Sequence, residues 1–164
     1  MKSHLFSRET LKAYKFIVLV LRLAYYLVYL LYKPQIYSIM LKQKYQSVLD
    51  LGEKLNIQDG DVTVQNGILN IKGIAGTPYE KNLLWDAIKS AGGENPSDLN
   101  ADIDVRDASV YHRHIVKRGE TLGGIAKHYY GNALNYKQIF RANSGVLKNP
   151  DTIYPDQELV IPNL

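Results

Sequence analysis

Hydrophobic positions divide this sequence into an apolar N-terminal stretch and two later regions in which apolar residues recur at helix and strand spacings. Residues 16–32 form an apolar run of 17 residues that only Arg22 interrupts. This length is at the lower limit for a helix that crosses a bilayer, and an arginine near its centre costs about 2.5–3.5 kcal/mol on insertion. No small-residue cleavage site follows the run, so we do not expect a cleaved secretory peptide.

The first 39 residues leave two interpretations open. They carry six basic residues and one acidic residue, and their composition differs sharply from that of the rest of the chain. In one interpretation, residues 1–39 are a basic hydrophobic tail in which residues 16–32 form a short anchor in the inner membrane. In the other, translation starts at Met40, which stands directly before a helical pattern, and the preceding stretch is a mis-assigned start. We favour the second interpretation.

Residues 41–106 predict a middle domain that begins with a helix and a hairpin. Apolar residues at helical spacings form one face of the helix, namely Leu41, Tyr45, Val48, Leu49 and Leu55. We expect Asp59-Gly60 to introduce the hairpin and Asn66-Gly67 to supply its two-residue type I′ turn. That turn pairs two apolar residues of the first strand with two of the second on a single face of the sheet: Val64 with Leu69, and Val62 with Ile71.

A second helix and a last strand complete the middle domain. Thr77 is an N-cap, Pro78 occupies the first helical position, and Glu80 occupies the third. Gly92-Gly93 ends this helix. After a loop, apolar residues alternate with polar ones in the last strand: Ala101, Ile103 and Val105. The predicted order is therefore α-β-β-α-β, in an α+β chain of two small domains.

The order of these elements resembles a BON domain. The resemblance includes a glycine at the hairpin, Gly67, and another that closes the second strand, Gly73. It covers about residues 43–106.

Residues 112–164 predict a second domain with the order β-α-α-β. His114–Lys117 is expected to be a short strand, Thr121 an N-cap, and Leu159 and Ile161 part of a closing strand. The succession of motifs resembles a LysM module over its full length. The segments that carry the resemblance are His114–Leu122, Ile125-Ala126, Tyr130-Gly131, Ile139–Asn143, Asn149–Pro155 and Leu159–Pro162. Residues 107–111 are predicted to form a linker between the two domains.

The LysM resemblance implies a shallow groove for glycans that contain N-acetylglucosamine, such as peptidoglycan, and no enzymatic activity. Its two walls map to Gly119, Glu120, Thr121 and Leu122 on one side and to Pro150, Asp151, Thr152 and Ile153 on the other. Backbone groups of these loops can bond an acetamido group, and Leu122 and Ile153 can pack its methyl group. The alternative is that these residues only form turns. Three positions differ from the family pattern: Glu120 replaces aspartate, Gly123 replaces serine and Asp156 replaces glycine.

A BON-like domain followed directly by a LysM module resembles the bacterial potassium-binding protein family. This resemblance implies a cytoplasmic protein that changes shape on binding potassium. Residues 41–107 carry seven basic and eleven acidic residues, a net charge of −4, and potassium takes carboxylate and carbonyl oxygens as ligands. No short sequence signature marks such ligands, so the metal-binding residues remain unknown.

Composition and motif spacing exclude several other classes. The overall net charge of +4 comes from the first 39 residues, so we do not expect nucleic-acid binding. The sequence contains no cysteine, and His112, His114 and His128 lack the spacing of a zinc motif. No serine, histidine and carboxylate set stands out as catalytic.

Two functions follow from these patterns. The first is a non-enzymatic, cytoplasmic potassium-binding protein whose two domains dock on cation binding, with no cofactor apart from potassium. The alternative is a peptidoglycan-binding protein held at the cell envelope, with a membrane as partner only if residues 16–32 are an anchor.

Overall fold

A computed structural model of the chain describes residues 8–164. The helices and strands are α1 (Arg8–Lys44), α2 (Gln46–Lys54), β1 (Gln58–Gln65), β2 (Ile68–Ala75), α3 (Pro78–Gly92), β3 (Leu99–Val105), β4 (His112–Ile115), α4 (Leu122–Tyr130), the 3-10 helix η1 (Ala133–Asn135), α5 (Tyr136–Ala142) and β5 (Glu158–Ile161). The described chain forms two compact units that divide between Gln43 and Lys44. The predicted α+β class and both predicted element orders are confirmed.

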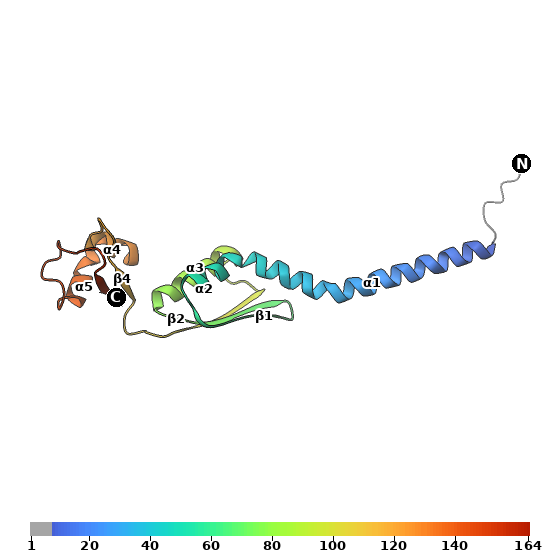
Figure 1. Cartoon of the computed structure of the whole chain (residues 1–164), viewed down its shortest axis with the longest axis horizontal. Helices are drawn as coiled ribbons and strands as arrows, with labels where there is room; N and C mark the ends of the chain where they lie inside the picture. Colours follow the sequence, from blue (N-terminus) through green and yellow to red (C-terminus); the bar gives the residue numbers. More distant parts are fainter. Residues whose placement is uncertain (1–7) are drawn as a thin grey trace, which may run out of the picture. The chain divides into compact units, whose positions relative to one another are not determined.

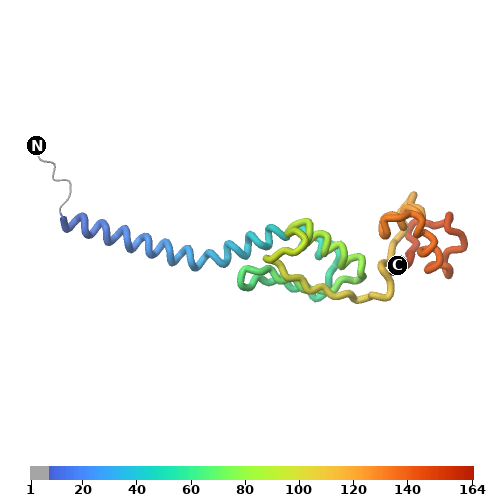
Figure 2. Tube along the Cα trace, turned by 180° about the vertical axis from the view of Figure 1, so that it is seen from behind, coloured from blue at the N-terminus to red at the C-terminus, as the bar shows by residue number. Residues whose placement is uncertain are grey.

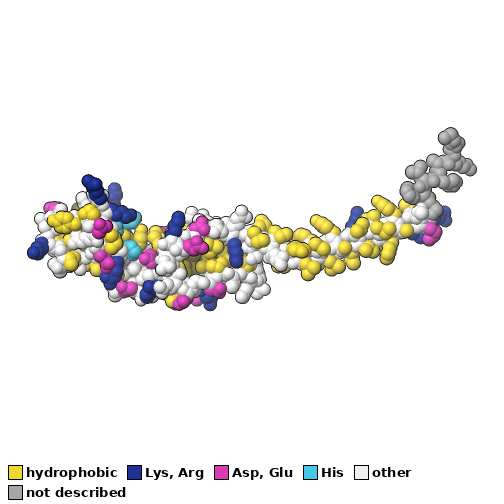
Figure 3. Space-filling model, viewed as in Figure 1, with side chains coloured by type: hydrophobic (Ala, Val, Ile, Leu, Met, Phe, Trp, Pro, Cys, Tyr) yellow, Lys and Arg dark blue, Asp and Glu magenta, His cyan; other side chains and the backbone are white. Residues whose placement is uncertain are grey.

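Helix α1 is a single helix that continues through Met40 without a break. Its apolar side chains are exposed, and hydrophobic atoms cover most of the face seen in Figure 3. By length and composition alone it could cross a membrane, and it is the only such helix among the described residues. At 37 residues the helix is about 55 Å long, longer than the hydrocarbon core of a bilayer.

The middle domain has two layers, with α2 and α3 on one face of a three-stranded sheet (Figure 1). Figure 2 shows the same layering from behind. The strand order is β1-β2-β3, in which β1 and β2 are antiparallel while β2 and β3 are parallel. Helix α3 makes the crossover that a parallel pair requires. Alternate residues of β3, including Leu99 and Ile103, are buried beneath the helices.

The predicted hairpin register is confirmed. Val64 pairs with Leu69 and Val62 with Ile71. Asn66 and Gly67 have φ values of 52° and 77°, as a type I′ turn requires. The expected position of Asp59-Gly60 is wrong, because these residues lie inside β1 rather than before it. The register shifts between Gln58 and Asp61, and Asp59 has a φ of 50°, so the segment forms a bulge.

The ends of α3 also agree with the prediction. The Thr77 hydroxyl accepts a hydrogen bond from the Glu80 N–H at 3.5 Å, and Gly93 ends the helix with a φ of 87°. The Glu80 carboxylate accepts from the Gly76 N–H at 2.8 Å, one residue earlier than in a standard capping box.

The helix expected from residue 41 is two helices instead of one. Helix α1 ends at Lys44, and α2 begins after Tyr45, which lies outside helical geometry with φ −101° and ψ 18°. Tyr45 is fully buried and donates a hydrogen bond to Asp98 at 2.7 Å, while Lys44 binds the other oxygen of Asp98 at 2.6 Å. The break between α1 and α2 thus lies at Tyr45, whose ring is buried and whose hydroxyl is hydrogen-bonded.

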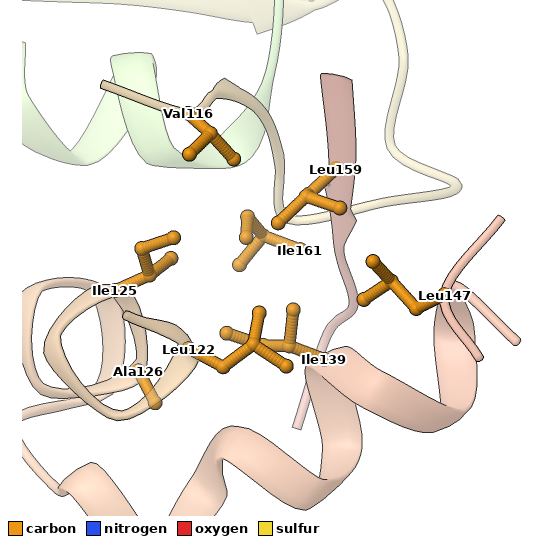
Figure 4. Packing of buried hydrophobic residues seen from close by; sticks show 8 residues of the cluster. All are labelled: Val116, Leu122, Ile125, Ala126, Ile139, Leu147, Leu159 and Ile161. Atoms are coloured by element: carbon orange, nitrogen blue, oxygen red, sulfur yellow. The ribbon is translucent and has the colours of Figure 1, made fainter. Parts of the chain in front are cut away.

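The LysM module (residues 112–164) has a two-stranded antiparallel sheet in which His114 pairs with Leu159 and His112 with Ile161. The first strand begins two residues before the predicted one and ends at Ile115. Strand β5 and both α-helices contribute to a closed core, together with Val116, which follows β4, and Leu147, which follows α5 (Figure 4). The buried members of this core are Val116, Leu122, Ile125, Ala126, Ile139, Leu147, Leu159 and Ile161.

Backbone hydrogen bonds hold the linker between the middle domain and the LysM module. The Asp107 N–H donates to Gly76 O at 3.1 Å. The Tyr111 N–H donates to Ile161 O at 2.8 Å, and the Tyr111 carbonyl accepts from the Tyr79 N–H at 3.2 Å. The linker is therefore bonded to both domains.

Candidate functional site

The two predicted loops line one groove in the LysM module, with a volume of about 390 Å³. This volume falls in the range of small-ligand sites. Of the eight predicted residues, Gly119 and Thr152 do not line the groove. The lining consists of Glu120, Thr121, Leu122, Gly123, Tyr136, Pro150, Asp151 and Ile153. The structure therefore brings the two predicted walls together.

The first wall is shaped by a turn and a helix cap. Gly119 has a φ of 85°, a conformation that side-chain-bearing residues rarely adopt, and it turns the chain out of β4. The Thr121 hydroxyl accepts from the Gly124 N–H at 3.1 Å and starts α4. Leu122 is only 2% exposed and belongs to the core, so this wall offers a ligand mainly backbone groups at the start of the helix.

Glu120 is held in place by two hydrogen bonds to the same carboxylate oxygen. Its Oε2 accepts from the Lys117 N–H at 2.7 Å and lies 2.7 Å from His114 Nε2. Partial burial by itself raises the pKa of Glu120, but these hydrogen bonds and the charges of His114 and Lys117 outweigh it, so the pKa lies below its usual value. Glu120 is therefore ionised at neutral pH and fixed in the wall.

The second wall is a turn that follows Asn149. The Asn149 side chain accepts from the Asp151 N–H at 2.9 Å, and its carbonyl accepts from the Thr152 N–H at 3.2 Å. The Asp151 carboxylate is exposed and makes no hydrogen bond or ion pair with any residue from 8 to 164. Ile153 is half-buried and packs against the LysM core. This wall thus combines a carboxylate that can accept sugar hydroxyls with an apolar surface.

Two lining residues were not predicted as part of the site. Tyr136 is the first residue of α5, directly after η1, and its half-buried side chain lines the groove. Gly123 stands where the LysM family pattern has serine, and it also lines the groove. A Cβ added at Gly123 would lie 4.0 Å from both Ala133 Cβ and Thr121 Oγ1, an ordinary contact distance. A serine at this position would therefore fit.

The middle domain contains a larger cavity, of about 520 Å³, between α2 and the sheet. Its walls are mainly apolar side chains and glycines of the domain core: Val48, Leu49, Gly52, Ile57, Gly60, Val62, Ile71, Gly73, Leu84 and Ile103. Glu53, Asn56 and Lys72 also contribute to the lining.

The described residues, 8–164, contain no cluster of three or more His, Cys, Asp or Glu residues placed to hold a metal ion. The histidines considered for zinc each have a protein partner. His112 Nδ1 lies 3.0 Å from Thr77 Oγ1, His128 Nε2 lies 2.9 Å from the Tyr79 hydroxyl, and His114 lies between Glu120 and Tyr129. Potassium sites built from backbone carbonyls follow a different donor chemistry.

Comparisons with known proteins assign the C-terminal region and the family. The LysM domain model matches residues 114–162. The potassium binding protein Kbp of Escherichia coli is 38% identical over 115 residues, which cover 67% of this chain and 70% of that protein. An uncharacterized protein of Deinococcus radiodurans is 35% identical over 92 residues, which cover 56% of this chain and 32% of that protein.

The match to Kbp is longer than the LysM module and therefore includes part of the middle domain. The BON resemblance of the middle domain stays a prediction. The LysM domain and the relationship to Kbp identify a bacterial-type binding protein. The chain belongs to the family of the potassium binding protein Kbp.

Proposed function

We propose that this chain is a non-enzymatic potassium-binding protein whose middle domain and LysM module dock on cation binding. The observation that carries the proposal is the 38% identity to Kbp over a stretch longer than the LysM module. The net charge of −4 over residues 41–107 favours a cation as ligand. Carbonyl and carboxylate oxygens are the donors that potassium would use. The corresponding proposal for location is the cytoplasm.

The contacts between the two domains support a docked state. Tyr79 of α3 lies between rings of the LysM module, with centroid distances of 4.9 Å to His112 and 4.7 Å to Tyr129. Its hydroxyl lies 2.9 Å from His128 Nε2. Burial raises the pKa of Tyr79 and lowers that of His112, as expected where two domains exclude water from polar rings.

The test is a potassium titration of the full chain in a non-ionic detergent, followed by calorimetry. Domain docking can be followed in parallel by energy transfer between dyes on Ser90→Cys and Ser144→Cys, because the native sequence has no cysteine. Both serines are exposed. We expect saturable heat and a change in transfer with potassium, and neither with sodium at equal ionic strength. No heat and no change at millimolar potassium would contradict the proposal.

A second candidate is a glycan-binding protein held at the cell envelope. Two observations favour it: the groove that joins both predicted walls, and the exposed apolar surface of α1. In this case residues 16–32 would anchor the chain, and the groove would bind N-acetylglucosamine units of peptidoglycan.

The second candidate predicts co-sedimentation with purified peptidoglycan and retention in membranes after alkaline carbonate washing. Ile153→Ala should weaken sedimentation, because it removes the apolar side chain of the second wall. Val146→Ala is the matched control, since Val146 is 63% exposed and does not line the groove. Equal binding by the two variants would exclude the groove as the glycan site.

A further inference from the structure

A continuous set of contacts runs from the middle domain to the first wall of the groove. It starts at Tyr79 of α3, whose ring meets that of Tyr129 edge-on at 4.7 Å. The Tyr129 hydroxyl lies 2.9 Å from His114 Nδ1, and His114 Nε2 lies 2.7 Å from Glu120 Oε2. Glu120 lines the groove. Each member touches the next, so no gap separates the domain junction from the groove.

The chemistry of the members fixes the direction of the hydrogen bonds at Glu120. Glu120 is ionised at neutral pH and can only accept, so Nε2 of His114 carries a proton. Burial raises the pKa of Tyr129 well above its usual value, so its hydroxyl stays protonated and can pair with Nδ1 of His114 at 2.9 Å. The Lys117 N–H donates to the same Glu120 oxygen. These hydrogen bonds together hold the Glu120 carboxylate in one position.

Because His114 and Tyr129 are buried or half-buried, the position of His114 depends on the contact between Tyr79 and Tyr129. His114 is 9% exposed, and its ring is held by the edge contact with Tyr129 at 5.6 Å as well as by both nitrogens. Tyr129 is half-buried, and the ring of Tyr79 covers it from the middle domain. If the middle domain moves away, Tyr129 loses this cover and water can compete for its hydroxyl. His114 and Glu120 would then lose their fixed positions.

We propose that His114 and Tyr129 are positioning residues for the Glu120 wall of the groove, and that they couple docking of the middle domain to glycan binding. The proposal rests on the groove being a glycan site, the second candidate function above. Coupling between sites is reciprocal, so a glycan in the groove would also favour the docked arrangement.

The test uses the full chain in detergent, with chitotetraose, a soluble chain of four N-acetylglucosamine units, as the probe. Tyr79→Ala removes the ring that covers Tyr129 but touches no groove residue, whereas Tyr79→Phe keeps the ring and loses only the hydroxyl. Tyr129→Phe removes the bond to His114 and keeps the ring. Tyr154→Phe is the matched control, because Tyr154 is 64% exposed and does not line the groove.

Two readouts separate coupling from the proposed function. The amide signals of Lys117 and Glu120 in nuclear magnetic resonance report the position of the Glu120 carboxylate without any ligand, and the Ile139 amide reports an intact core. We expect Tyr79→Ala and Tyr129→Phe each to shift the Lys117 signal and to weaken chitotetraose binding about threefold to tenfold. Tyr79→Phe keeps the ring over Tyr129 but loses the contact with His128, so both effects should be smaller than with Tyr79→Ala. Tyr154→Phe should leave both unchanged. The double variant Tyr79→Ala/Tyr129→Phe should lose no more than either single variant.

The results distinguish two failures. If the Lys117 signal does not move in Tyr79→Ala, or if the two losses in affinity simply add, the coupling is overturned even when chitotetraose binds the unaltered chain. If the unaltered chain does not bind chitotetraose but Tyr79→Ala shifts the Lys117 signal, the glycan function fails and the positioning by His114 and Tyr129 stands.

Discussion

The cavity in the middle domain and the groove in the LysM module differ in size and in the origin of their walls. The cavity is the larger, at about 520 Å³ against about 390 Å³. Core side chains and glycines line the cavity, whereas turn residues, a helix start and a tyrosine line the groove. Polar groups with fixed positions occur in the groove, where Glu120 is hydrogen-bonded, but the cavity has only a few polar side chains in its lining.

The two hollows therefore differ in the origin of their walls as well as in volume. Three of the residues that line the cavity are glycines, Gly52, Gly60 and Gly73. A Cβ added at Gly73 would lie 2.5 Å from Ile57 Cγ2, so the backbone of β2 approaches that side chain closely. The groove also borders a packed core, since Leu122 belongs to the LysM core and Ile153 packs against it, but its lining includes the hydrogen-bonded Glu120 carboxylate.

The largest effect we expect is a difference in the loss of stability when an isoleucine is replaced by alanine in each of the two domains. Ile139→Ala, in the closed LysM core, should destabilise its domain by about 2–5 kcal/mol. Ile71→Ala, at the half-buried wall of the cavity, should cost about 1 kcal/mol, because its side chain already faces a gap. Amide hydrogen exchange measured separately for each domain gives both values.

Equal losses for Ile139→Ala and Ile71→Ala would mean that the middle domain is packed as closely as the LysM core. In that case the middle domain would have no cavity in solution, and the two domains would not differ in packing.

A second substitution tests whether the middle domain is loose only at the cavity. A Cβ at Gly92 would overlap the hydroxyl of Tyr45 and lie 2.8 Å from Pro96 Cβ. Tyr45 is fully buried and bonded to Asp98, so it cannot move without losing that bond. We expect Gly92→Ala to destabilise the middle domain by about 1–3 kcal/mol. Gly145→Ala is the control, since an added Cβ there meets no atom within 4 Å.

The outcome for Gly92→Ala is read from hydrogen exchange of α3 and β3. An effect no larger than that of Gly145→Ala would show that the whole middle domain yields easily, and not only the part that lines the cavity.

Local patterns predicted much of the fold because they act over short sequence distances. The geometry of the Asn66-Gly67 turn sets the pairing of Val64 with Leu69 without any contact from distant parts of the chain. Thr77 and Thr121 start helices as expected, because an N-cap needs only a hydroxyl and a nearby N–H. Asp156 has a φ of 66°, consistent with the glycine expected at this position.

Features that depend on contacts between distant segments could not be predicted in this way. The bulge at Asp59 lies beside Ile57, whose side chain approaches Gly73 of β2 closely, and the pattern of β1 alone does not show it. Tyr136 lines the groove, although it lies three residues before the buried Ile139, a helical spacing that is typical of a core residue. The contact between Tyr79 and Tyr129 joins two domains and has no signature in either.

The next prediction concerns ligand contact and has a smaller effect. Tyr136→Ala should weaken chitotetraose binding about threefold to tenfold, because an aromatic ring on the groove packs against a sugar face. Tyr154→Ala removes an exposed ring outside the groove and should change nothing. Ile71→Ala, in the larger cavity, should also leave affinity unchanged. Calorimetry with the full chain measures all three, and a loss confined to Ile71→Ala would move the site to the middle domain.

The smallest effect separates the two carboxylates of the groove by their response to pH. The folded pKa of Glu120 lies below 4.5, its unfolded value, so its contribution to stability is fully present above pH 4.5 and is lost as the pH falls through the folded pKa. Glu120→Gln should therefore flatten the loss of LysM stability between neutral pH and about pH 3, as followed by hydrogen exchange or thermal melting. Asp151→Asn should not flatten it, because the Asp151 carboxylate has no bond to any of the described residues 8–164. Its effect should appear only on chitotetraose affinity. If Asp151→Asn instead changed the pH dependence of stability and Glu120→Gln did not, the Glu120 carboxylate would not be the one that hydrogen bonds hold in place.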